Sequence, residues 1–229
     1  MNTTLSRLRS ANSHVTIRSI DDDAFAQYGR LLTAYDPQEM IVRARAILPT
    51  TEGIVYEPAV PALEAPSALN TAIEREINGG MPVQVGWCYG KNLQMAGLEY
   101  HKGCEVNICL TDVILLVGDE RDIVYGQQIT YDTTRVAAFY APAGSVVEFH
   151  PWNLHYAPIQ ALSACQFATL VYLPRGTNYP LPFQAPQSGE NRLLFAVNKW
   201  LLVHPAQTDT VDQGAYPGLA GDDIFLTAV

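Results

Sequence analysis

The 229-residue sequence has few basic residues and no long apolar run. Lys and Arg total 14 against 23 Asp and Glu, which gives a formal net charge of -9. No stretch gathers Lys and Arg into the basic face that phosphate backbones require, so we expect no nucleic-acid partner. No apolar run approaches the ~20 residues that span a bilayer, and no apolar segment follows Arg7 and Arg9 as it would in a signal peptide. We therefore expect no membrane partner and a cytoplasmic location.

Cysteines are also scarce, and internal repeats and low-complexity tracts are absent. The four cysteines are too few and too irregularly spaced for a disulfide framework or a CxxC zinc site, so we interpret them as small buried hydrophobes. Hydrophobic residues make up 48% of the sequence and charged residues 16%. This composition is sufficient for one apolar core, and we expect a single domain over residues 1–229.

The N-terminal third of the sequence has helix signals between two irregular ends. Residues 1–13 are polar and predict a flexible arm, while residues 205–229, with Gly, Asp and Pro, predict an irregular C-terminal tail. Asp21 to Asp23 offer N-caps for a short helix that Gly29 closes. Segments 37–47 and 67–77 also predict helices, the second ending at a Gly-Gly pair.

From Pro82 onward the pattern changes to short apolar or alternating runs separated by Gly, Pro and Asp. Such runs predict strands, here over residues 83–89, 94–101, 105–110, 113–117, 136–141, 146–149 and 165–173. Their regular spacing predicts an all-β fold with a few short helices, an antiparallel sandwich or barrel. The apolar segment 191–203 fits either a strand pair or a helix packed over the sheet.

Four residues of metal-binding type are placed so that they can converge. Glu99 and His101 are two apart and therefore share one face of a strand. Glu105 follows a Lys-Gly pair that can form a tight turn, so its carboxylate can return to the first two from an adjacent strand. His155 follows a second turn and faces the same interior. His150 is a rival fourth ligand, although we favour a turn role for it because Pro151 follows.

Two imidazoles and two carboxylates form a borderline-to-hard ligand set. This set suits one divalent Mn, Fe, Ni or Zn ion better than a soft Cu(I) site. Calcium would require more oxygen ligands. The sequence therefore predicts a single metal site formed by Glu99, His101, Glu105 and His155.

The spacing of the first three candidate ligands resembles the first motif of the cupin superfamily, HxH followed by a Glu, with Glu99 in place of its first histidine. Pro142-Ala-Gly144 followed by His155 is similar to the second motif, a Pro-x-Gly turn and then a metal histidine. The usual second motif places that histidine three residues after the glycine, where this sequence has Val147.

The later position of His155 is more similar to the ureidoglycolate lyase branch of cupins, in which a turn, an aromatic residue and then His-x-Pro occur. The opening Phe25-x-x-Tyr28-Gly29 also resembles the Phe-x-x-Tyr-Gly of that branch. Overall the sequence most resembles an uncharacterised group of bacterial cupins related to it. The resemblance implies a conical double-stranded β-helix barrel, or jelly roll, with one metal at its wide mouth and a homodimeric assembly.

Cupins include lyases, isomerases, dioxygenases and binding proteins, so the resemblance leaves the reaction open. Our leading hypothesis is a metal-dependent lyase or isomerase acting on a small polyoxygenated substrate, such as a hydroxy acid, a ureidoglycolate-like compound or a sugar derivative. The alternatives are an Fe(II) dioxygenase and a non-catalytic sugar-binding or regulatory cupin. Candidates for proton transfer are Glu148, Tyr156 and Tyr89, while Lys91 and Arg175 are candidate carboxylate or phosphate clamps.

Overall fold

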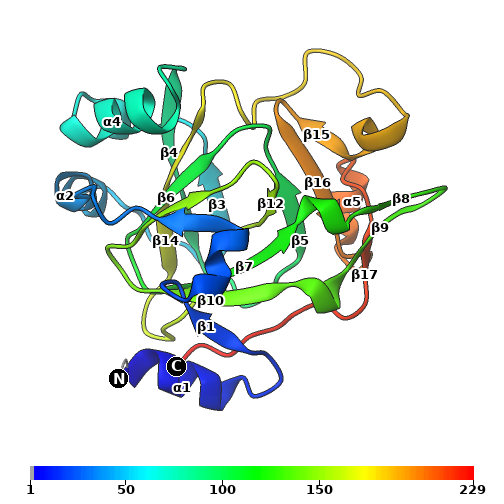
Figure 1. Ribbon diagram of the computed structural model, residues 1–229, viewed down its shortest axis with the longest axis horizontal. Coiled ribbons are helices and arrows are strands. Elements are labelled where there is room, and N and C mark those ends of the chain that lie inside the picture. The colour runs from blue at the N-terminus through cyan, green and yellow to red at the C-terminus, as the bar shows by residue number, and fades with distance from the viewer. Residues whose placement is uncertain (1–2) are drawn as a thin grey trace.

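Two β-sheets packed face to face form the body of the protein (Figure 1). The structure is a computed structural model and describes residues 3–229. The larger sheet has the strand order β2-β11-β6-β14-β4-β3, and all its neighbours are antiparallel. Its strands are β2 (Gly29–Leu31), β11 (Val146–Phe149), β6 (Glu105–Cys109), β14 (Phe167–Pro174), β4 (Val83–Gly90) and β3 (Ile54–Glu57).

The second sheet has the order β1-β10-β7-β12, with β13 pairing the other end of β7. Its strands are β1 (Ile17–Ser19), β10 (Ala137–Ala141), β7 (Val113–Asp119), β12 (Asn153–Leu154) and β13 (Ile159–Gln160). All its pairs are antiparallel except β1 with β10. These two sheets confirm the prediction of an all-β jelly roll with a few short helices.

The side chains that point inward from both sheets form the central core. Because side chains alternate along a strand, Asn107 and Cys109 of β6 face this interior, whereas Val106 and Ile108 face outward. Phe139 of β10 is fully buried in the central core. The interior therefore holds polar as well as apolar side chains at one end of β6.

Short helices cover the outer face of the larger sheet, beside β4 and β6 in Figure 1. They are α2 (Gln38–Arg45), α3 (Pro61–Glu64) and α4 (Ala68–Ala72), which continues as a π-helical turn, η2 (Ile73–Ile77). Ser67 caps α4 by accepting a hydrogen bond from the amide of Asn70. The helices predicted over 37–47 and 67–77 are thus present. Their cover makes β4 buried on both faces.

A smaller sheet, β15-β16-β5, flanks the sandwich and resolves the open assignment of residues 191–203 as a strand pair. It consists of β15 (Leu194–Ala196), β16 (Lys199–Val203) and β5 (Gly97–Tyr100). A peripheral sheet contains β8 (Val124–Tyr125), β9 (Ile129–Asp132) and β17 (Leu219–Ala220). The remaining helical elements here are η3 (Glu120–Asp122), η4 (Thr133–Arg135), η5 (Gly189–Leu193) and α5 (Thr208–Asp212).

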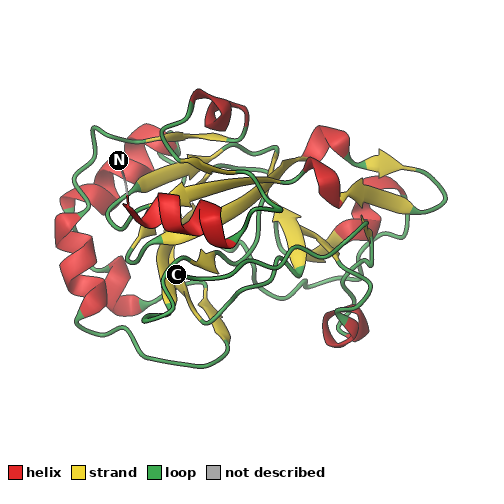
Figure 2. Cartoon of the chain, turned by 90° about the horizontal axis from the view of Figure 1, so that it is seen from below, coloured by secondary structure: helices red, strands yellow, loops and turns green. Residues whose placement is uncertain are grey.

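The predicted flexible N-terminal arm is wrong for residues 3–13, while Met1 and Asn2 lie outside the described residues. Residues 3–11 form the helix α1 (Thr3–Ala11), whose Leu5 and Leu8 are buried. Asn12 then exchanges two hydrogen bonds with the backbone of Thr227, which joins the two ends of the chain (Figures 1 and 2). The sequence signal was the three-residue spacing of the two leucines, which matches one face of a helix.

Residues 205–229 are mostly irregular apart from α5 and β17. Leu226 near its end is buried in the same core cluster as α1. Over residues 3–229, none of the helices is both long and apolar enough to span a membrane.

The 3₁₀ helix η1 (Asp23–Gln27) begins with a side-chain cap that can be tested. Asp22 accepts a hydrogen bond of 3.0 Å from the amide of Ala24. We expect Asp22→Ala to lower the free energy of unfolding by about 1 kcal/mol, the usual value of such a cap. Urea denaturation measures this, with Asp21→Ala as the control because Asp21 is an exposed neighbour outside the cap. Equal losses in both variants would contradict the capping role.

Candidate metal centre

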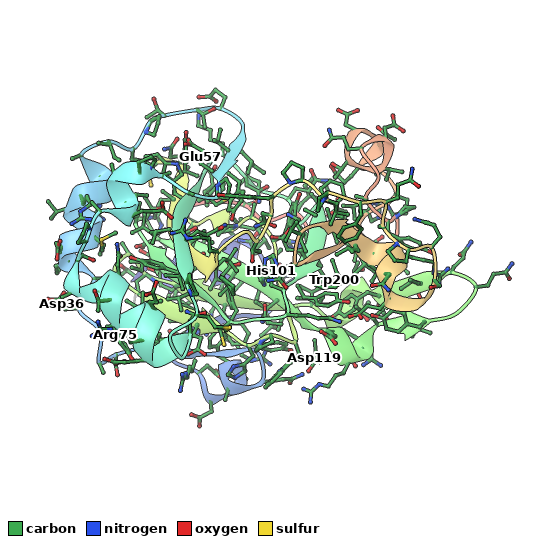
Figure 3. All side chains as sticks on the ribbon, turned by 90° about the horizontal axis from the view of Figure 1, so that it is seen from above. Asp36, Glu57, Arg75, His101, Asp119 and Trp200 are labelled. Atoms are coloured by element: carbon green, nitrogen blue, oxygen red, sulfur yellow. The ribbon has the colours of Figure 1, made fainter. Side chains whose placement is uncertain are left out.

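The four predicted ligands meet in the interior at one end of the sandwich. Glu99 and His155 are paired across a two-way backbone bridge, with N to O distances of 2.7 and 2.9 Å. His101 follows β5, and Glu105 is the first residue of β6. His101 lies near the centre of the molecule in Figure 3, far from surface residues such as Asp36 and Arg75. Each of the four residues is at most 9% exposed.

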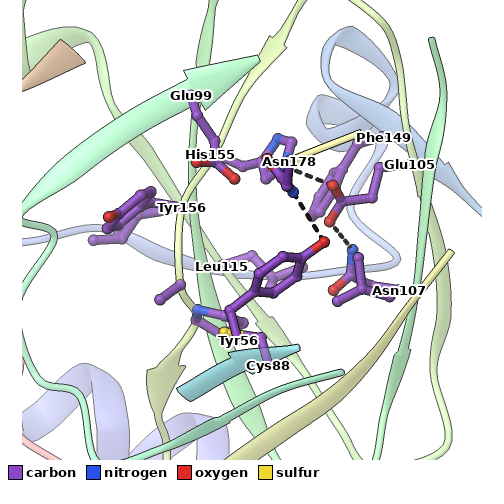
Figure 4. A pocket seen from close by; sticks show the side chains of 14 residues that line it. Tyr56, Cys88, Glu99, Glu105, Asn107, Leu115, Phe149, His155, Tyr156 and Asn178 are labelled. Carbon is purple, nitrogen blue, oxygen red and sulfur yellow. Dashed lines mark hydrogen bonds and ion pairs between the residues drawn. The ribbon is translucent and has the colours of Figure 1, made fainter. Parts of the chain in front are cut away.

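Glu105 lies between the two imidazoles. Its Oε2 is 3.3 Å from Nε2 of His101 and 3.2 Å from Nε2 of His155 (Figure 4 shows the His155 contact). The same Nε2 atom of His101 is 3.7 Å from Oε1 of Glu99. One ligand atom from each of Glu99, His101 and His155 lies within 4.8 Å of the others. These three residues form the candidate group of metal ligands, and Glu105 adjoins it through its contacts to both imidazoles.

Both imidazoles are oriented by contacts to their other ring nitrogen. Nδ1 of His101 is 2.7 Å from the backbone carbonyl of Asn198, and Nδ1 of His155 is 3.1 Å from the side-chain oxygen of Asn153. Because an oxygen of this kind only accepts, each Nδ1 carries a hydrogen, and Nε2 is the ring atom left to bind a metal. This is the orientation that metal-binding histidines adopt.

The donor set fits a divalent cation. Nε2 of His101 is buried and, among the described residues, makes no hydrogen bond, whereas Oε2 of Glu99 pairs with the ammonium group of Lys199. Two nearby carboxylates repel each other in a low-dielectric interior, and buried polar atoms normally have a partner. A bound cation would satisfy both requirements. The site has the charge and the donor atoms for such an ion.

The electrostatics of the cluster follow from the same contacts. Burial alone would raise the pKa of Glu99, but the positive charge of Lys199 and then His101 lower it to about 2. Burial likewise opposes ionisation of Glu105, yet His155 and His101 hold its pKa well below the usual range. For His101, burial lowers the pKa, but the nearby carboxylates of Glu105 and Glu99 favour the protonated ring more strongly and raise the value to about 9.

A cavity beside the cluster enclosed by both sheets provides space for a ligand (Figure 4). The volume of the cavity itself is about 40 Å³, so it suits only a small ligand. Tyr156, one of the three predicted proton-transfer residues, lines it, and burial raises the pKa of the Tyr156 phenol. Tyr156 is thus a protonated, partly buried residue beside the ligand cluster.

The other two predicted proton-transfer residues lie on the wrong faces of their strands. Phe149 of β11 points inward and stacks on His155 with ring centroids 4.7 Å apart, so Glu148 points outward and pairs with Arg30 at 2.5 Å. On β4, Cys88 lines the cavity, whereas Tyr89 faces outward, with its hydroxyl 3.5 Å from Glu57. Neither Glu148 nor Tyr89 reaches the cavity.

The remaining sequence candidates also lie outside the cluster. Lys91 pairs with Glu52 and Arg175 with Glu64, each at 2.9 Å, on the surface. His150 stacks near Trp152 rather than joining the ligands. The choice of His155 over His150 agrees with this arrangement.

Three site residues were missed from the sequence. Lys199, the first residue of β16, forms an ion pair with Glu99. Tyr56 and Asn178 also line the cavity, where the Asn178 amide donates a 2.9 Å hydrogen bond to the Tyr56 hydroxyl. Oδ1 of Asn178 is buried without a hydrogen-bond partner among the described residues. The sequence signal for Lys199 was its position as a lone charged residue directly before the apolar run 200–203, where it shares a strand face with Leu201.

The fold and the cluster together define a jelly-roll protein with a buried Glu/His/His candidate metal site. Residues 17–224 match the family described as a domain of unknown function (DUF4867), and the chain belongs to that family. A search of curated proteins gives no match.

Among solved structures, the chain is similar to an oxalate decarboxylase, with 11% identity and a TM-score of 0.32 over 54% of this chain and 26% of that chain. The oxalate decarboxylase from Bacillus subtilis gives 11% identity and a TM-score of 0.29 over 44% and 23%. A mutant of salicylate 1,2-dioxygenase from Pseudoaminobacter salicylatoxidans, in complex with gentisate, gives 8% and 0.30 over 60% and 30%. The aligned part spans less than a third of each of these three proteins, and such partial likenesses assign no activity.

Proposed function

We propose that this protein is a metal-dependent cupin enzyme, a lyase or an isomerase that acts on a small polyoxygenated substrate. The substrate would be a hydroxy acid, a ureidoglycolate-like compound or a sugar derivative. The observation that carries this proposal is the convergence of Glu99, His101, Glu105 and His155 beside one cavity. This donor set suits Mn, Fe, Ni or Zn. A closer relation to ureidoglycolate lyase, and assembly as a homodimer, stay predictions.

The protein's own residues divide the work of such a reaction. The four ligands would hold the ion, which when bound supplies a Lewis acid for a carbonyl or hydroxyl oxygen of the substrate. Tyr156, whose pKa is raised by burial, keeps its proton at neutral pH and is suited to donate it to a developing negative charge. Phe149 and Leu115 line the cavity with apolar surface, which limits the access of water.

A substrate screen tests the proposal. The purified protein, reconstituted separately with Mn, Fe, Ni and Zn, is incubated with hydroxy acids, ureidoglycolate and aldose or ketose sugars, in air and under argon. We expect turnover that requires one of the metals and does not require O₂. A requirement for O₂ would replace the proposal by an Fe(II) dioxygenase. Binding of a sugar without turnover by any metal form would replace it by a binding protein.

Metal affinity should rise with pH, because a metal and a proton compete for His101. Without metal, the carboxylates stabilise protonated His101 and raise its pKa to about 9, whereas metal binding requires the neutral ring. Between pH 7 and pH 9, we expect the apparent affinity to increase about tenfold per unit as this one proton is released, and to level off above that range. Competition with a chelator of known affinity measures it. A flat profile would contradict the proton competition.

A further inference from the structure

A mostly buried positive charge, Lys199, lies next to residues that line the cavity and is not part of the predicted ligand set. β16 pairs with β5 in an antiparallel register that places Leu201 opposite Glu99. Since alternate residues share a strand face, Lys199 lies on the same face as Leu201 and points toward the ligand cluster. Trp200, between them, faces the opposite core. The register of this strand pair is thus what brings a lysine to the site.

The Lys199 side chain is only 14% exposed, which is unusual for lysine. Its ammonium group pairs with Glu99 and lies 5.5 Å from the centre of the Tyr156 ring. Both of these residues line the cavity. A fixed cation therefore stands at the edge of the ligand cavity.

The charge count of the site indicates what this cation is for. The two carboxylates of Glu99 and Glu105 balance a divalent ion, and the histidines bind a metal as neutral rings. Lys199 then leaves one positive charge uncompensated in a buried place. The protein as a whole carries a net charge of -9 and repels anions at long range, so anion binding requires such a local charge.

We propose that Lys199 is a substrate-binding residue and that the cavity takes a small monoanion, a carboxylate with an adjacent hydroxyl or carbonyl oxygen. This inference rests on the proposed metal-dependent function and narrows its substrate class to organic acids, which excludes neutral sugars. The carboxylate would supply the negative charge that the metal-bound site lacks. The adjacent hydroxyl or carbonyl oxygen would supply a second ligand atom to the same site. The Tyr56 hydroxyl and the unpartnered Asn178 oxygen, which also line the cavity, offer hydrogen bonds to a further hydroxyl of the acid.

The test compares glycolate with its neutral analogue glycolamide by isothermal titration calorimetry on the metal-loaded protein. We expect Lys199→Met to keep the wild-type metal content, to weaken glycolate binding by about tenfold or more and to leave glycolamide binding unchanged. Lys199→Arg should retain the preference for glycolate. Lys102→Met is the matched control, since Lys102 pairs with Glu190 on the surface and its loss changes the net charge equally.

Two results would overturn the inference while leaving the proposed function in place. One is equal glycolate affinity in Lys199→Met and Lys102→Met. The other is loss of metal from Lys199→Met, which would assign Lys199 to holding Glu99 in position rather than to the substrate. Wild-type protein that binds none of the four metals would instead refute the proposed function itself. The elemental analysis that precedes each titration separates these cases.

Discussion

Replacing both His101 and His155 by alanine is expected to abolish metal binding. The two Nε2 atoms are the nitrogen donors of the cluster, and each lies within 3.3 Å of Glu105 Oε2. Two carboxylates that repel each other are left, and a buried pair of this kind does not hold a transition metal at protein concentrations near micromolar. Elemental analysis of the purified protein should fall from about one equivalent to background.

Single variants show whether each ligand is needed. We expect Glu99→Ala, His101→Ala and His155→Ala each to lose most of the metal, because a site of this size has no spare donor. His150→Ala is the matched control, since it removes an imidazole that faces Trp152 instead of the cluster. Far-ultraviolet circular dichroism checks that every variant is folded. The same metal content in all four proteins would refute the ligand assignment.

The ligand cluster could be predicted from strand periodicity and turn signals in the sequence. Glu99 and His101 share a face because they are two residues apart, and turn signals return Glu105 and His155 to the same place. Those inferences depend only on local geometry. The strand-rich region after Pro82 could likewise be predicted, because turn residues separate its apolar runs.

The side chains of Glu148 and Tyr89 point away from the cavity, contrary to the prediction, for a common physical reason. Their strands are buried on both sides, by the central core and by the outer helices, so polar and apolar residues do not separate cleanly between faces. The two-residue period then shows which side chains share a face of the strand, but it does not show which of the two faces points into the cavity. Lys199 was missed for a different reason. It reaches Glu99 through a strand pairing between segments far apart in the sequence, and no local pattern reports such a contact.

We expect the central core, rather than the metal, to supply most of the stability of the fold. The Phe139→Ala variant tests how much the core contributes to the free energy of unfolding. Phe139 is fully buried, with its ring 5.1 Å from that of Phe25 and 5.9 Å from that of Tyr28. Truncation removes these contacts and leaves a cavity between two sheets that cannot fully close. We expect the free energy of unfolding to fall by about 3 to 5 kcal/mol, measured by urea denaturation of the metal-free protein.

Phe183→Ala is the control for this truncation, because Phe183 is 56% exposed and the same change there should cost well under about 1 kcal/mol. Similar losses in both variants would contradict the core assignment. The metal content of folded Phe139→Ala answers a second question. Phe25 also contacts Phe149, which stacks on His155, so the ligand rests on the same aromatic cluster. Retained metal would show that β12 and the backbone bridge to Glu99 fix His155 on their own, whereas reduced affinity would show that core packing sets the geometry of the site.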